Sequence, residues 1–212
     1  MWKKAVIMGA SALVAFGALR WQLAGRFVEE PAFAVERDLG AGSEVRRYEP
    51  CVRAETIVEA STSEEAANAG FRRLAGYIFG KNDRSEKIAM TAPVSQVRAG
   101  EKIAMTAPVT QAAAGDGRWL VTFTMPRGRT IADLPTPQDA TVSLHAIPAR
   151  RVAVLRYSGT TSTERVDEKI RQLRDALAKS SIDAPGPAIS ARYDPPWVLP
   201  LLRRNEIWIE LD

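Results

Sequence analysis

Cysteine and histidine are almost absent from this chain, which contains one residue of each kind, Cys51 and His145. A lone cysteine excludes an internal disulfide, and this pair is too few for the four His and Cys ligands of a structural zinc site. The sequence also lacks a Gly-x-Ser-x-Gly elbow, a phosphate-binding loop and a dinucleotide-binding fingerprint. The common signatures of enzymes are therefore missing, and we expect no catalytic activity.

Positive charge is only slightly in excess, with a formal net charge of +4. The sequence has no cluster of Lys and Arg interleaved with aromatic residues, which is the pattern of a surface that follows phosphates. We therefore expect no nucleic-acid partner.

Acidic residues are absent from residues 1–28. Lys3 and Lys4 precede an apolar run at 5–19, a pattern typical of secretory signals and signal anchors. No Ala-x-Ala site follows that run promptly, because the one at 32–34 lies far beyond it, which favours an uncleaved membrane anchor over a cleaved signal peptide. We expect the rest of the chain to face the periplasm or the cell exterior.

A literal repeat is present: EKIAMTAPV at residues 86–94 returns at 101–109. Apolar residues, including Met90 and Met105, alternate with others in each copy, which predicts two strands with one buried face. The short polar segment 95–100 would join them as a hairpin. Two interpretations remain open, a duplication that only lengthens a loop and a Met-lined hairpin that faces a ligand.

Two segments have apolar residues at helical spacing, and their stripes superimpose at an offset of 99 residues. The first helix is expected from the capping residues 61–64 to Gly80, and the second from 161–164. The flanking strands are expected at the first repeat copy and at residues 43–49, 52–59, 118–125, 141–146, 151–157, 187–193 and 206–211. This order predicts an α+β fold made of two strand-strand-helix-strand-strand halves, with a pseudo-two-fold relation between them.

Five stretches resemble the SOUL haem-binding protein family. They are KIAMTAPV at residues 87–94 and 102–109, VAVLRYSG at 152–159, YDPPW at 193–197 and RRNEIW at 203–208. The resemblance extends over residues 35–212. It implies a distorted eight-stranded antiparallel β-barrel with two helices, and non-covalent binding of haem or a related tetrapyrrole in a shallow apolar groove.

The resemblance also implies which residues bind the ligand. The expected groove follows the first helix, where its apolar residues are Phe71, Leu74, Ala75, Tyr77 and Ile78. Arg72 and Arg73 on the same helix are candidates for pairing with haem propionates, because guanidinium groups bind carboxylates well. The alternative is that the apolar set forms core packing and the two arginines form a solvated face.

His145 is the candidate iron ligand, because histidine commonly ligates haem iron. Alternation along its expected strand places it with Thr141 and Ser143, opposite Val142 and Leu144. The alternative is an exposed or hydrogen-bonded strand residue.

Three functional hypotheses follow. The first is non-enzymatic haem binding that buffers or transfers haem in the cell envelope. The second is a small-molecule hydrolase or isomerase that uses the same groove, with Cys51, His145, Tyr193 and Glu206 as its reactive set. The third is a lipid-binding or structural envelope protein.

Overall fold

The computed structural model describes residues 28–98, 117–195 and 197–211. This part of the chain contains helices α2 (Ser63–Ile78) and α3 (Thr163–Lys179) and two short 3₁₀ helices, η2 (Ile131–Asp133) and η3 (Pro200–Leu202). Its strands are β1 (Phe33–Gly40), β2 (Ser43–Tyr48), β3 (Cys51–Glu59), β4 (Val94–Arg98), β5 (Arg118–Thr124), β6 (Val142–Ile147), β7 (Arg150–Tyr157), β8 (Ala188–Arg192) and β9 (Asn205–Leu211).

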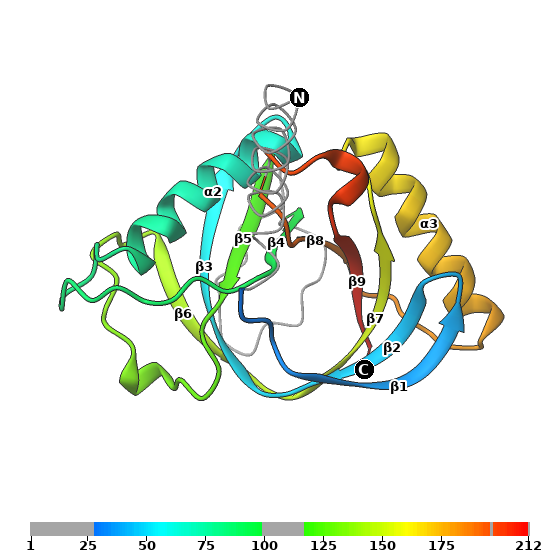
Figure 1. Ribbon diagram of the computed structural model, residues 1–212, viewed down its shortest axis with the longest axis horizontal. Helices are drawn as coiled ribbons and strands as arrows, with labels where there is room; N and C mark the ends of the chain where they lie inside the picture. Colours follow the sequence, from blue (N-terminus) through cyan, green and yellow to red (C-terminus); the bar gives the residue numbers. More distant parts are fainter. Residues whose placement is uncertain (1–27, 99–116, 196, 212) are drawn as a thin grey trace, which may run out of the picture.

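These strands form one antiparallel sheet in the order β1-β2-β7-β9-β8-β4-β5-β3-β6. The sheet curls into a half-barrel whose edges are β1 and β6 (Figure 1). The α+β class is confirmed, but the described residues contain nine strands instead of the expected eight. The additional strand is β1, whose side chains are almost all exposed.

The strand order is symmetrical about the central pair β4 and β8. Outwards from that pair come β5 and β9, then β3 and β7, then β6 and β2. Strands at equal distances from the central pair therefore occupy the same position in each predicted half. Strand β1 has no counterpart in the other half. A geometric two-fold axis stays a prediction.

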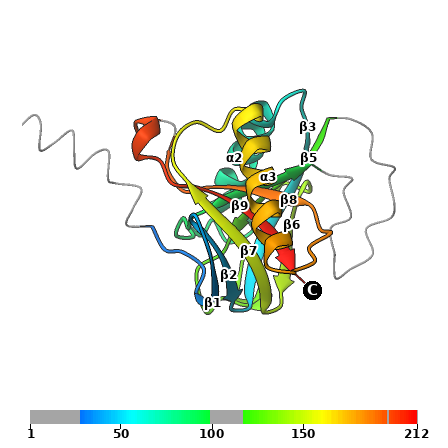
Figure 2. The same ribbon diagram turned by 90° about the vertical axis from the view of Figure 1, so that its right-hand side faces the viewer.

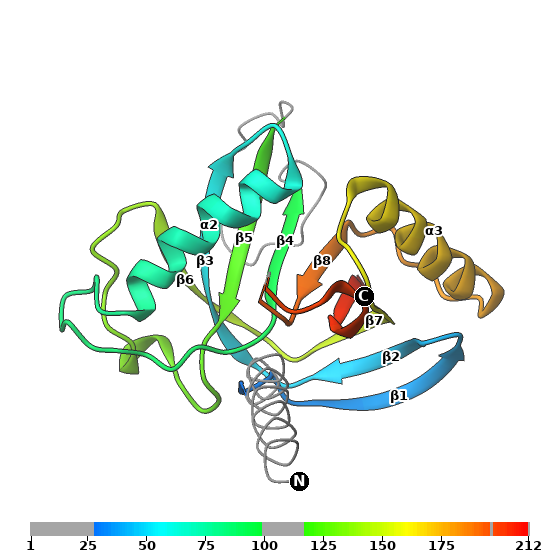
Figure 3. The ribbon, with the colours of Figure 1, turned by 45° about the horizontal axis from the view of Figure 1, so that its top comes forward.

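Both helices begin close to where the sequence predicts. Thr62 caps α2: its side chain accepts the N–H of Glu65, and the Glu65 carboxylate accepts the N–H of Thr62. This capping box satisfies amides that the first turn would leave unpaired. Ser162 caps α3. Helix α2 packs against β3 and β5, and α3 against β7 and β9, so both helices cover the outer face of the curled sheet (Figures 1 and 3).

The inner face of the sheet, which points away from the helices, has its own apolar cluster. Tyr48, Val152, Val154 and Trp208 are buried there, and the rings of Tyr48 and Trp208 have centroids 5.2 Å apart. A β-sheet places alternate residues on opposite faces, so the same strands supply this cluster and the two clusters beneath the helices.

The strand predicted at the first repeat copy is wrong. Residues 86–93 contain no strand, and Ile88 instead donates its N–H to the Ile78 carbonyl at the end of α2. The predicted turn at 95–100 is also wrong, because residues 95–98 belong to β4. There they pair with β5 and β8, and this pairing on both sides stabilises a strand although the segment is polar. The second copy lies outside the described residues.

The predicted anchor also lies outside the described residues, except for its last residue. Within residues 28–98, 117–195 and 197–211, no helix combines the length and the hydropathy needed to cross a membrane.

Candidate functional site

A cavity of about 520 Å³ opens on the inner face of the sheet near its β6 edge. We call it the inner-face pocket, and its volume lies within the range of small-ligand sites. Most of its walls come from alternate residues of β3, β5 and β6, which point to the same face. The lining residues are Glu55, Thr56, Ile57, Glu59, Arg73, Arg118, Leu120, Thr141, Ser143 and His145.

His145 lies on the wall of this pocket formed by β6. Its Nε2 atom is 3.0 Å from Ser143 Oγ and 3.8 Å from Glu55 Oε2, and its side chain is 31% exposed. Thr141, Ser143 and His145 all line the pocket, which confirms the face predicted for His145. The imidazole is therefore partly open to solvent.

Glu55 faces His145 from the neighbouring strand β3. It is 6% exposed, and burial raises the pKa of its carboxyl group, although the charges of Arg53 and His145 oppose the shift. Ser143 is its register partner on β6. The arrangement gives the pocket a half-exposed imidazole next to a poorly hydrated carboxyl group.

Arg73 reaches the pocket from helix α2. Its Nη1 atom donates to the carbonyl of Ile57 at 3.0 Å. The β6 ladder ends at the pair formed by Thr56 and Val142, so β3 has a free edge beyond that point. The guanidinium group covers this edge and enters the pocket.

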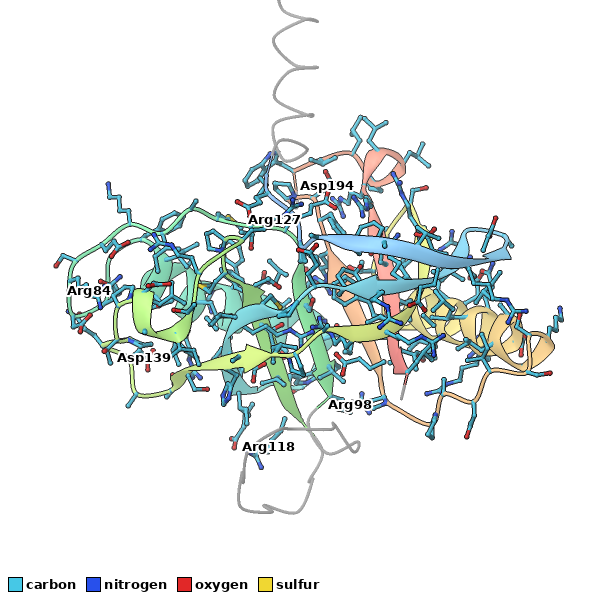
Figure 4. All side chains as sticks on the ribbon, turned by 90° about the horizontal axis from the view of Figure 1, so that it is seen from below. Arg84, Arg98, Arg118, Arg127, Asp139 and Asp194 are labelled. Carbon is cyan, nitrogen blue, oxygen red and sulfur yellow. The ribbon has the colours of Figure 1, made fainter. Side chains whose placement is uncertain are left out.

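Ile57 and Leu120 supply apolar surface to the same pocket, and Arg118 adds a second guanidinium group at the start of β5 (Figure 4). The pocket thus combines an imidazole, two apolar side chains and two cations. Two carboxyl groups, Glu55 and Glu59, accompany them.

The other residues expected along α2 do not line this pocket. Leu74, Tyr77 and Ile78 are buried in the core between α2 and the sheet, and Tyr77 Oη donates to the Pro135 carbonyl at 2.9 Å. These three side chains offer no accessible surface to a ligand in this structure, because the sheet covers them.

Phe71 and Ala75 have different positions on α2. Phe71 is 38% exposed and packs edge-on against Phe123, whereas Ala75 is buried. Arg72 is exposed. Of the seven residues predicted on this helix, the structure brings only Arg73 together with His145; ligand contact by the others stays a prediction.

The reactive set of the hydrolase hypothesis is divided between three places. Tyr193 Oη donates to Glu206 Oε2 at 2.7 Å inside the barrel, and neither residue lines the inner-face pocket. Cys51 lies 3.9 Å from Arg150 Nη1 and does not line it either. Only His145 faces the cavity. In the described part of the chain, no three His, Cys, Asp or Glu side chains group as metal ligands.

Sequence reasoning missed Glu55, Glu59 and Arg118 as pocket residues. Alternation along β3 does place Glu55 and Glu59 on one face. The pairing of β3 with β5 and β6, which brings Arg118 and His145 beside them, has no short-range signal in the sequence.

Comparison with known proteins supports a common ancestry over most of the chain. The family model described as SOUL heme-binding protein matches residues 28–210. Human Heme-binding protein 2 is 29% identical over 191 residues, which cover 88% of this chain and 87% of that protein.

Solved structures with low sequence identity show the same fold. The C-terminal domain of EcmrR has a TM-score of 0.56 at 8% sequence identity. The match covers 80% of this chain and 96% of the EcmrR chain. A hydrolase from Listeria innocua has a TM-score of 0.53 at 8% sequence identity. The match covers 84% of this chain and 94% of the hydrolase chain. Likeness at this identity concerns the fold alone. The family match, by contrast, spans the helices, the sheet and the pocket, and the chain therefore belongs to the SOUL haem-binding protein family.

Proposed function

We propose that this protein binds haem or a related tetrapyrrole non-covalently in the inner-face pocket and acts without catalysing a reaction. The observation that carries the proposal is the meeting of His145, Arg73 and Arg118 around one cavity that Ile57 and Leu120 also line. Haem presents three kinds of surface: an iron centre, an apolar ring and two carboxylates. The pocket has a chemically matching group for each.

Each group has a defined role in this proposal. His145 Nε2, which lies beside Ser143 Oγ, would be the iron ligand. Ile57 and Leu120 contact the ring. Arg73 and Arg118 pair with the propionates, for which guanidinium groups have the right geometry.

The proposal has a rival site on the same protein. The apolar surface around Phe71 on α2 is the groove that the family resemblance implies, and a haem held there would need no ligand from His145. The experiment below separates the two sites.

The proposed role is to buffer haem or transfer it in the cell envelope. The pocket is open to solvent at a sheet edge. A buffering or transfer role requires such an opening, because the haem must be released again. The acid-free segment 1–28 supports membrane anchoring, with the folded part facing the periplasm or cell exterior.

A haem titration of the full-length protein, followed by Soret absorbance, tests the proposal. We expect saturable binding with a shifted Soret band. The variant His145→Ala should lose that shift, whereas the neighbouring variant Ser143→Ala should keep it. Non-saturating absorbance would exclude haem as the ligand. Binding weakened by Phe71→Ala and unchanged by His145→Ala would place the haem on α2 instead.

The two other functions have less support. A hydrolase would need its reactive residues at one place, but His145 is separated from the buried pair Tyr193 and Glu206. A lipid such as a fatty acid would contact Ile57 and Leu120 and pair its carboxylate with the arginines, but it leaves His145 without a role. Competition between haem and a fatty acid in the same titration distinguishes a lipid site from a haem site.

A further inference from the structure

The segment between β8 and β9 exposes an unusual amount of apolar surface. Trp197 is 51% exposed, Leu199 58%, Leu201 85% and Leu202 39%. These are four of the nine large hydrophobic side chains that the described residues expose, and they lie within six positions. Soluble proteins seldom gather such residues without a binding partner. We call residues 197–202 the apolar loop.

The apolar loop is held in place by its backbone and by one buried residue. Val198 is only 1% exposed, and its carbonyl accepts a hydrogen bond from Arg203 Nε at 2.7 Å. The carbonyl of Pro200 accepts the N–H of Gly159 at 2.9 Å, and residues 200–202 form the helix η3. The loop therefore displays its leucines on a fixed support.

The apolar loop lies on the side of the molecule where the described chain begins. Arg204, which follows the loop closely, places Nη1 2.8 Å and 3.0 Å from the two carboxylate oxygens of Glu30. Arg127 donates to the Glu30 carbonyl from the same side. Figure 4 shows Arg127 and Asp194 close together there, and Figure 2 shows η3 on the side of the first described residues.

The segment that precedes Glu30 in the sequence has a matching chemistry. Residues 1–28 contain an apolar run at 5–19, four basic residues and no acid. A basic apolar segment is attracted to a bilayer with anionic headgroups. Residue 28, where the described chain begins, thus connects this segment to the side of the molecule that carries the apolar loop.

We propose that the apolar loop inserts into the headgroup region of an anionic lipid bilayer. Trp197 suits the bilayer interface, because an indole ring combines an apolar body with an N–H donor. Leu199 and Leu201 would reach the acyl boundary. The positive charge of residues 1–28 favours a surface of opposite charge, which an anionic bilayer supplies and a second copy of this positively charged chain does not. The inference does not depend on haem binding.

The test uses the full-length protein in vesicles of phosphatidylcholine and phosphatidylglycerol. An environment-sensitive fluorophore is attached at Leu201→Cys in a Cys51→Ser background. The matched control carries the label at Ala178→Cys on the exposed face of α3. We expect vesicles to shift the emission at position 201 to the blue and to bring it within reach of a quencher carried by the lipid, with neither change at position 178.

Three results would overturn the proposal. The first is a label at position 201 that stays as exposed to water as the label at position 178. The second is a blue shift without lipid that grows with protein concentration, which would assign the loop to a second copy. The third is a blue shift without lipid that does not depend on concentration, which would show that residues 1–27 cover the loop. Haem binding is measured on the same samples, so failure of the lipid contact is distinguished from failure of the haem site.

Discussion

Arg46 Nη1 lies 3.0 Å from Glu206 Oε2 in the interior of the half-barrel, where the two side chains are 4% and 0% exposed. Arg46 comes from β2 and Glu206 from β9. The same carboxylate accepts hydrogen bonds from Tyr193 Oη and Trp208 Nε1, each at 2.7 Å, and Arg204 binds its other oxygen at 2.8 Å. A buried charge surrounded in this way is satisfied only while the strands from both halves are assembled.

The first prediction concerns this pair. Glu206→Gln removes the negative charge and leaves Arg46 buried with reduced compensation, so we expect a loss of about 3–5 kcal/mol in the free energy of unfolding. Urea denaturation measures it. The control Glu168→Gln removes the exposed ion pairs with Arg165 and Lys169 on α3 and should leave the free energy of unfolding nearly unchanged. The double variant Arg46→Met with Glu206→Leu should lower the free energy of unfolding less than Glu206→Gln does. An equal or larger decrease would contradict this account.

The second prediction concerns acid. Burial alone would raise the pKa of Glu206, but the charges of Arg46 and Arg204 and two hydrogen bonds outweigh it, so the pKa lies below its ordinary value. A lowered pKa gives stability that is complete above the unfolded pKa, about 4.3, and is lost as the pH falls through the folded pKa.

Thermal melting from pH 7 to pH 3 measures this effect. The melting temperature of the wild type should fall more steeply below about pH 4.3 than that of the double variant Arg46→Met with Glu206→Leu, which lacks the group. Parallel curves for the two proteins would show that other carboxylates control acid unfolding.

The third prediction compares two glycines of helix α2. A Cβ atom at Gly70 would lie 2.5 Å from Cβ and Cγ2 of Val121 on β5, so Gly70→Ala should cost about 1–3 kcal/mol despite the better helix propensity of alanine. At Gly76 the nearest atom is Cδ of the flexible Lys81, at 3.2 Å. Gly76→Ala should therefore stabilise the protein by about 0.5–1 kcal/mol. Chemical denaturation of both variants checks the prediction, and a gain at both positions would contradict the close packing of α2 on β5.

The fourth prediction concerns the propionates. Removing a guanidinium group that pairs with a carboxylate costs about 1.5–3 kcal/mol, so Arg73→Ala should weaken haem binding about tenfold or more. Arg72→Ala is the matched control, because Arg72 is exposed and does not line the inner-face pocket. Haem dimethyl ester, which lacks free carboxylates, should bind both variants equally. If Arg72→Ala weakened haem binding more than Arg73→Ala, the propionates would be assigned to the solvent face of α2 instead.

Much of the fold could be predicted because its signals are local. The capping residues before α2 and α3 and their apolar stripes fix where each helix begins and which face it buries. Alternation in 141–146 assigned His145 to the face that carries Thr141 and Ser143, and the structure places all three on the pocket. These patterns depend on the geometry of a single helix or strand, which neighbouring residues in the sequence determine.

Strand β4 and the inner-face pocket could not be predicted in the same way. Residues 94–98 form a strand because β5 and β8 pair with them from both sides, whereas the repeated segment before them binds the end of α2 through Ile88. Arg73 enters the pocket because β6 leaves part of the β3 edge free. The partners in each case are distant in sequence.

The sequence by itself therefore determined the two helices, most strands, the α+β class and the family. The tertiary structure decided the strand register and the meeting of His145 with Arg73. The physical reason is that helix caps and side-chain periodicity act over a few residues, whereas a pocket forms where strands from distant parts of the chain pair and leave an edge uncovered.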